Sequence, residues 1–218
     1  MKIFNTLILL FSLVCFSLTA QTDKKATVII DTESSSLKWI GEKITGSQHY
    51  GSLTFEKGEL IFCDQDNQGN PSLCSGYFIV DMNSLNVEDL SGSSKDRLEG
   101  HLKSNDFFSV KTHKKSKLTI LSSKKTEKGY LVDGTLTIKD ITHPIQFELE
   151  SEAGGFVSNL VFDRSKYDVQ YGSGSFFENL GDKLILDDIA LTVNLYIKQM
   201  DVTDLSPNLI GKQTDIID

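Results

Sequence analysis

Ile145-Gln-Phe-Glu-Leu-Glu150 alternates apolar side chains with polar ones, and Ile189-Ala-Leu-Thr-Val-Asn-Leu-Tyr-Ile197 repeats the alternation over a longer stretch. Successive side chains of a β-strand point to opposite faces of the sheet, so a period of two predicts strands with one dry and one wet face. Antiparallel sheets that pack one face on a core show this pattern. These two stretches therefore place the chain in the all-β class.

Weaker patterns of the same kind recur along the chain, separated by turn signals such as Glu56-Lys-Gly58 and Ala153-Gly-Gly155. They predict further strands at residues 27–30, 37–44, 52–55, 59–62, 77–82, 117–121, 130–138 and 156–163. Many short antiparallel strands of this kind are typical of a β-barrel or a β-sandwich.

Residues 93–102 are the one segment that predicts a helix, with Ser93 or Ser94 as the cap and Asp96 and Glu99 in the first turn. The helix is a short excursion from an otherwise all-β chain. A barrel of eight strands has an interior that is either filled by side chains or holds one small ligand. The alternation of the strands does not decide between these two outcomes.

The two ends of the chain differ from the strand region. Residues 1–20 combine a basic start at Lys2 with an apolar run that ends at Ala20, which predicts a secretory signal peptide. We therefore expect an exported protein in the periplasm, or a secreted one. Residues 21–198 form the expected barrel domain. Residues 199–218 lose the periodicity and are expected to form a loosely packed tail.

The composition excludes some partners. The chain has 218 residues, 30 of them acidic and 22 basic, and its net charge of −8 argues against nucleic acid, which favours clustered Lys and Arg. After the first 20 residues, no apolar run approaches the roughly 20 residues of a membrane span. No stable membrane insertion is expected. The oligomeric state stays open, and a homodimer is one arrangement that the sequence allows.

Cys63 and Cys74 flank a segment rich in turn-forming residues and are the two cysteines left after export. An even number of cysteines in an exported chain favours a disulfide, here across a hairpin. Two reduced thiols on neighbouring strands are the alternative. The four histidines share no ligand spacing, so no metal site is expected.

Several short motifs, taken in order, resemble the YceI-like family. Gly100-His-Leu-Lys-Ser-Asn-Asp-Phe-Phe108 matches the most recognisable motif of that family, and Phe78-Ile-Val-Asp-Met82 matches its F-x-x-D-M strand. Gly134-Thr-Leu-Thr-Ile138 and Thr142-His-Pro144 match its later pair of strands. Trp39, His49 and Gly51 stand at early positions where the family has an aromatic residue, a histidine and a glycine. The resemblance covers residues 27–197.

This resemblance implies a lipocalin-like, antiparallel β-barrel that binds a polyisoprenoid or an isoprenoid quinone without a covalent bond, and needs no other cofactor. Ser109, His113, Leu118 and Asp168 depart from the family pattern at loops and strand ends, where they affect the ligand more than the fold. The alternative is an interaction module of the envelope stress response, with a filled barrel and a protein partner. No catalytic constellation is present in the sequence, so an enzyme is not expected.

The predicted site consists of apolar residues on the inward face of the strong strands and in the motif after the helix. These cavity candidates are Leu102, Phe107, Phe108, Phe147, Leu149, Leu191, Val193 and Leu195. His101 and Arg164 are candidates for the cavity mouth, where they would contact a headgroup. For His101 the alternative is a structural, hydrogen-bonded histidine, and for Arg164 it is an ion pair at the rim with Asp163 or Asp168.

Overall fold

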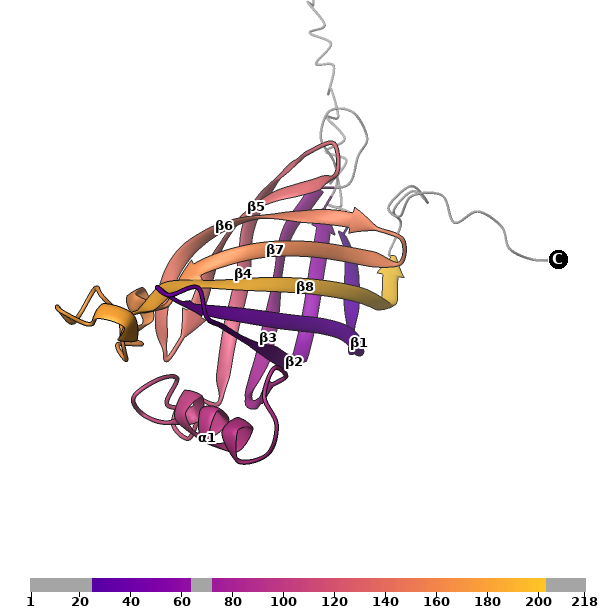
Figure 1. The fold of residues 1–218 in the computed structure, drawn as a ribbon. Helices are drawn as coiled ribbons and strands as arrows, with labels where there is room; N and C mark the ends of the chain where they lie inside the picture. Colours follow the sequence, from indigo (N-terminus) through magenta and orange to yellow (C-terminus); the bar gives the residue numbers. More distant parts are fainter. Residues whose placement is uncertain (1–24, 64–71, 203–218) are drawn as a thin grey trace, which may run out of the picture.

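The computed structural model describes residues 25–63 and 72–202, which form a closed barrel of eight antiparallel strands (Figure 1). Each strand pairs with the next along the chain, and the last pairs with the first. The fold class predicted from the alternation and the family resemblance is confirmed, and the barrel replaces the sandwich. The elements in chain order are β1 Lys25–Lys43, β2 Gln48–Cys63, β3 Ser72–Val87, α1 Gly92–Lys103, β4 Lys115–Lys125, β5 Gly129–Ile138, β6 Ile141–Glu152, β7 Gly155–Asp163, the 3-10 turns η1 Arg164–Tyr167 and η2 Gly181–Lys183, and β8 Ile185–Val202.

β1 and β2 are each one long strand, where the sequence predicted two short strands in each region. The predicted turn at residues 56–58 is instead a β-bulge. Phe55 pairs with Val80 and Lys57 pairs with Ile79, so two steps along β2 correspond to one step along β3. Gly58 is buried there, and a Cβ at this position would lie 2.9 Å from Cδ1 of Phe78. The glycine therefore marks close packing inside the barrel rather than a turn.

The helix lies within one residue of its predicted bounds, but its start differs. Ser91 is the cap, and it makes no side-chain capping hydrogen bond. The first turn holds no acidic residue. Glu99 lies further along, where its carboxylate accepts a hydrogen bond of 2.8 Å from the backbone N–H of Val87. This bond ties α1 to the end of β3.

The barrel domain ends later in the sequence than predicted. β8 continues to Val202, four residues past the expected boundary at 198, and Ala26 of β1 pairs with Val202. Residues 199–202 therefore belong to the sheet rather than to a tail. The rest of the expected tail, residues 203–218, and the expected signal peptide, residues 1–20, lie outside the described residues.

Aromatic side chains fill one end of the barrel. The Phe62 ring lies 5.8 Å from the Tyr130 ring and 6.3 Å from the Phe156 ring, measured between centroids. All three side chains are buried. Burial raises the pKa of the Tyr130 hydroxyl to about 12.

At the end of the barrel opposite this aromatic cluster, α1 lies across the barrel below the strands (Figure 1).

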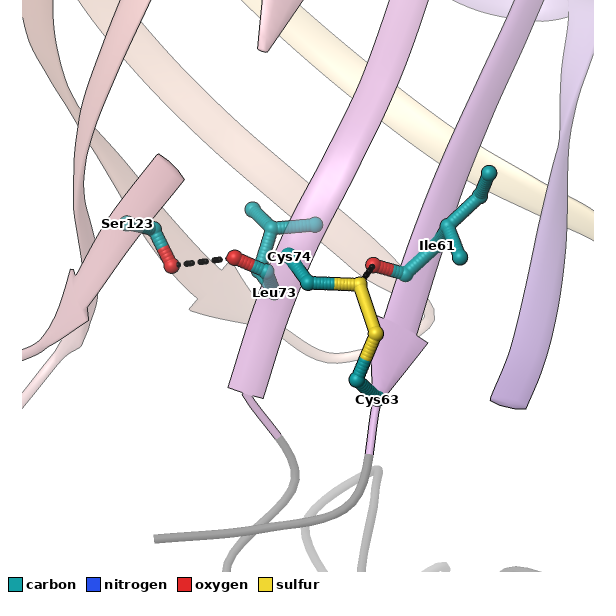
Figure 2. The surroundings of a disulfide bond; sticks show 5 residues. All are labelled: Ile61, Cys63, Leu73, Cys74 and Ser123. Atoms are coloured by element: carbon teal, nitrogen blue, oxygen red, sulfur yellow. Dashed lines mark hydrogen bonds between the residues drawn. A yellow bond between two sulfur atoms is a disulfide. The ribbon is translucent and has the colours of Figure 1, made fainter. Parts of the chain in front are cut away.

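A disulfide joins Cys63 at the end of β2 to Cys74 in β3, with the two Cα atoms 5.9 Å apart (Figure 2). The predicted pairing is confirmed. Next to it, the Ser123 hydroxyl of β4 donates a hydrogen bond of 2.6 Å to the carbonyl oxygen of Leu73. The covalent bond and this hydrogen bond secure the start of β3 on both sides.

Replacing both cysteines by serine should lower the free energy of unfolding by roughly 2–3 kcal/mol, because the bond closes a short loop and removes that much chain entropy from the unfolded state. The two cysteines are separated by 11 positions. The measurement is urea unfolding followed by circular dichroism. Dithiothreitol should shift the wild-type curve by the same amount and leave the variant curve unchanged. A variant as stable as the oxidised wild type would contradict this role.

Candidate ligand cavity

The interior of the barrel contains a cavity of 320 Å³ between the aromatic end and α1. All eight strands contribute to its wall, and α1 and the turn after it cover one end. The deep part of the wall is apolar, with Phe147 and Leu149 from β6 and Val193 and Leu195 from β8. The barrel is therefore hollow. The alternation of the strands had not decided between a hollow and a filled barrel.

Each cavity candidate from the sequence lies on this wall. These residues are Leu102, Phe107, Phe108, Phe147, Leu149, Leu191, Val193 and Leu195. The period of two places the β6 and β8 side chains on the inward face, as the hypothesis required. That these side chains bind a ligand stays a prediction.

Phe107 and Phe108 are positioned by the turn that ends α1. The backbone N–H of Phe108 donates to the carbonyl of Leu102 at 3.1 Å, and the Ser104 hydroxyl donates to the carbonyl of His101 at 2.7 Å. These bonds fold the chain back under the helix. The two phenyl rings then meet edge to face, with centroids 5.1 Å apart, and both line the cavity.

His101 lines the cavity, and its ring contacts are aromatic. That it contacts a headgroup at the mouth stays a prediction. Its centroid lies 4.3 Å from that of Tyr171 and 5.7 Å from that of Phe107, both edge to face. Within residues 25–63 and 72–202, no hydrogen bond to the His101 ring is present. The expected structural hydrogen bond is therefore not observed, and the ring forms part of an aromatic rim.

Arg164 is not at the mouth, which corrects the prediction from the sequence. Its side chain is fully buried and does not line the cavity. The guanidinium forms an ion pair of 3.2 Å with Oδ1 of Asp187, instead of the expected pair with Asp163 or Asp168. It also donates to four backbone carbonyls, those of Val169, Tyr171, Ile185 and Leu186, at 2.9 to 3.2 Å. Burial lowers the pKa of Arg164, although the charges of Asp187 and Asp163 oppose this shift.

Asp187 connects Arg164 to the serine-rich turn between β7 and β8. Its Oδ2 accepts hydrogen bonds from the hydroxyls of Ser173 and Ser175, at 2.9 and 2.7 Å. The Arg164 guanidinium also lies 5.3 Å from the centre of the Phe107 ring. The Arg164–Asp187 pair thus supports two parts of the rim, Phe107 and the segment that carries Tyr171.

β1 and β2 supply wall residues that the sequence analysis did not select. Trp39 and His49 were noted only as part of the family resemblance, and both line the cavity. Nδ1 of His49 lies 2.7 Å from Oδ2 of Asp89, and the N–H of Tyr50 donates to the other oxygen at 3.1 Å. Burial raises the pKa of Asp89, but the bonds from His49 and Tyr50 outweigh it and hold that pKa below its ordinary value.

The arrangement suits binding of an apolar molecule. No group of three or more His, Cys, Asp or Glu side chains in the described part of the chain could hold a metal ion. No helix in those same residues is long and apolar enough to cross a membrane. The wall is chiefly aliphatic and aromatic, with polar side chains such as His49 and His101 toward the helix-covered end.

Comparison with known proteins identifies the family of this barrel. The model of the YceI-like domain matches residues 29–197. The chain belongs to the YceI-like family. Among curated proteins, no match to the chain was found.

Several solved structures are similar to this chain at low sequence identity. BcnA of Burkholderia cenocepacia has a TM-score of 0.55 and 16% identity, covering 79% of this chain and 99% of that one. A polyisoprenoid-binding domain from Saccharophagus degradans, implicated in plant cell wall breakdown, has a TM-score of 0.49 and 15% identity, with coverages of 78% and 96%. The YCEI protein of Campylobacter jejuni has a TM-score of 0.48 and 20% identity, with coverages of 66% and 83%.

Replacing Arg164 by methionine in this YceI-like barrel should lower the free energy of unfolding by about 3–5 kcal/mol, because Asp187 and several buried carbonyls lose their partner. The matched control is Lys166→Met. Nζ of Lys166 forms an exposed ion pair of 3.9 Å with Asp163, and its loss should cost below about 1 kcal/mol. Urea unfolding measures both variants. Equal losses for the two would contradict the role assigned to Arg164.

Proposed function

We propose that this protein is a periplasmic carrier or store that holds a polyisoprenoid lipid or an isoprenoid quinone in its barrel. The observation that carries the proposal is the 320 Å³ cavity with an apolar wall. Membership of the YceI-like family supports it. The apolar run before Ala20 supports export to the periplasm.

The energetics of the cavity are adequate for this role. Burying about 300 Å² of prenyl chain contributes roughly 8 kcal/mol before the costs of association and ordering are subtracted. An apolar wall needs no directional bond along the tail, and a few polar groups suffice to orient the headgroup. The polar lining at His49 and His101 supports an orientation with the headgroup in the helix-covered half of the cavity and the tail toward Phe147 and Leu149.

The open cavity favours this proposal over the filled barrel with a protein partner. A filled barrel needs side chains that occupy the whole interior, and here aliphatic and aromatic side chains surround free space instead. The same apolar wall favours binding over catalysis, because it presents little polar chemistry to a tail that lies against it.

Leu191→Asp should weaken the binding of an added isoprenoid quinone by at least about tenfold, because a carboxylate on the wall must be desolvated when the tail enters. Leu191 lies on the cavity wall. The matched control is Val161→Asp, since Val161 is 57% exposed on the outer face of the neighbouring strand β7. Binding is measured by equilibrium dialysis, and circular dichroism checks the fold. A folded Leu191→Asp protein with wild-type affinity would rule out this cavity as the site.

A further inference from the structure

Exposed aromatic side chains gather in the segment between β7 and β8. Among the described residues, three of the nine large apolar side chains that are exposed lie within this one segment, namely Tyr171, Phe176 and Phe177. Their exposed fractions are 43 to 48%. Figure 1 shows the segment, in orange, projecting from the end of the barrel. Exposed apolar patches of this kind mark surfaces that contact another protein or a membrane.

Ile44, in the turn between β1 and β2, extends the same surface. Its backbone N–H donates a hydrogen bond of 3.0 Å to the carbonyl of Leu184, the last residue before β8. A Cβ at Gly174 would lie 3.2 Å from Cδ1 of the same leucine. The two segments thus meet at Leu184, and Ile44 itself is 57% exposed. We call the following residues the apolar patch: Ile44, Tyr171, Phe176 and Phe177.

Hydrogen bonds fix the backbone that carries the two phenylalanines. The N–H groups of Phe176 and Phe177 donate to the carbonyl of Ser173, at 3.3 and 3.1 Å. Ser173 is fully buried, and its hydroxyl donates to Asp187, the partner of Arg164. The exposed rings are therefore held outward by a segment that is anchored in the barrel.

The apolar patch borders the ligand cavity. Tyr171 belongs to both, since its side chain is half-exposed and also lines the cavity. Lys43, the residue before Ile44, and Ile185, at the start of β8, line the cavity as well. Phe177 shares a surface groove with Tyr171. A molecule that rests on the patch therefore lies next to the cavity wall.

We propose that the apolar patch docks the protein on the surface of a lipid bilayer, and that the prenyl lipid passes between the bilayer and the cavity at this point. This inference rests on the proposed function, because a prenyl lipid is almost insoluble in water and has to be collected from a membrane. Aromatic side chains favour the interface between lipid headgroups and acyl chains. A protein partner would explain exposed rings, but not their place beside a lipid cavity.

The charges around the patch favour insertion of apolar side chains over electrostatic attraction. The segment between β7 and β8 carries Glu178, Asp182 and Lys183, and the end of β1 carries Glu42 and Lys43. Three of these side chains are acidic and two are basic, and the whole chain has a net charge of −8. Attraction to anionic lipids depends on clustered Lys and Arg. We therefore expect docking that hardly depends on salt or on the charge of the lipid.

Sedimentation with sucrose-loaded vesicles tests the patch. The variant is Phe176→Ser/Phe177→Ser, and the matched control is Leu121→Ser/Tyr196→Ser, which removes side chains that are 60% and 48% exposed on β4 and β8. We expect the wild type and the control to bind phosphatidylcholine vesicles alike, with or without added phosphatidylglycerol. The variant should bind at least about tenfold more weakly, because it loses the apolar area that enters the interface. Circular dichroism checks the fold.

Three results of this experiment would overturn the inference. The first is equal binding by the variant and the control. The second is binding of the wild type that needs phosphatidylglycerol and disappears in salt. The third is a wild type that ignores both kinds of vesicle, and in that case light scattering that shows a wild-type dimer and a monomeric variant would assign the patch to contact between two copies of the chain.

Fluorescence gives a second test that does not depend on the double variant. Phe177→Trp places an indole in the patch, whereas Trp39, the only tryptophan of the native chain, is 8% exposed within the barrel. Vesicles of brominated phosphatidylcholine should quench the emission of Phe177→Trp and hardly change that of the wild type. Absence of quenching in both proteins would overturn the inference. These vesicles contain no prenyl lipid, so a protein that docks on them but takes up no quinone in equilibrium dialysis would lose the proposed function and keep the docking surface.

Discussion

The pairing of β1 with β8 is the constraint on which the rest of the structure depends. It closes the sheet, so every strand has two neighbours and every alternating side chain points either into the barrel or out of it. Phe62, Tyr130 and Phe156 then fill one end. At the other end, the described residues that cover the cavity come from α1 and its aromatic turn. The cavity thus forms because the sheet closes into a barrel and aromatic side chains fill only one of its two ends.

Long-range contacts build the covered end. Phe107 follows α1, Tyr171 precedes β8, and His101 lies between their rings. The buried Arg164–Asp187 pair joins these segments, since its guanidinium holds the carbonyl of Tyr171 and lies over the Phe107 ring. A buried ion pair is weak evidence for stability compared with apolar packing. Its value here is that it orders the segments that surround the cavity mouth.

The sequence allowed the inward face of β6 and β8 to be predicted, because their alternation is unbroken, and the cysteine pairing followed from the turn between two strands. β1 and β2 were divided wrongly because bulges interrupt the period, and because Gly58, which makes room for Phe78, was interpreted as a turn signal. Arg164 was misplaced because Asp163 and Asp168 are near in sequence, whereas its partner Asp187 is near only in the fold. Trp39 carried a signal only through the family resemblance.

The proposed function rests on the hollow, apolar interior of the barrel. The most direct test is native mass spectrometry of the protein purified from the cells that make it, followed by extraction with organic solvent. The expected result is a stoichiometric adduct that resolves into a prenyl lipid. A bare polypeptide mass, together with no uptake of added quinone or prenol, would contradict it.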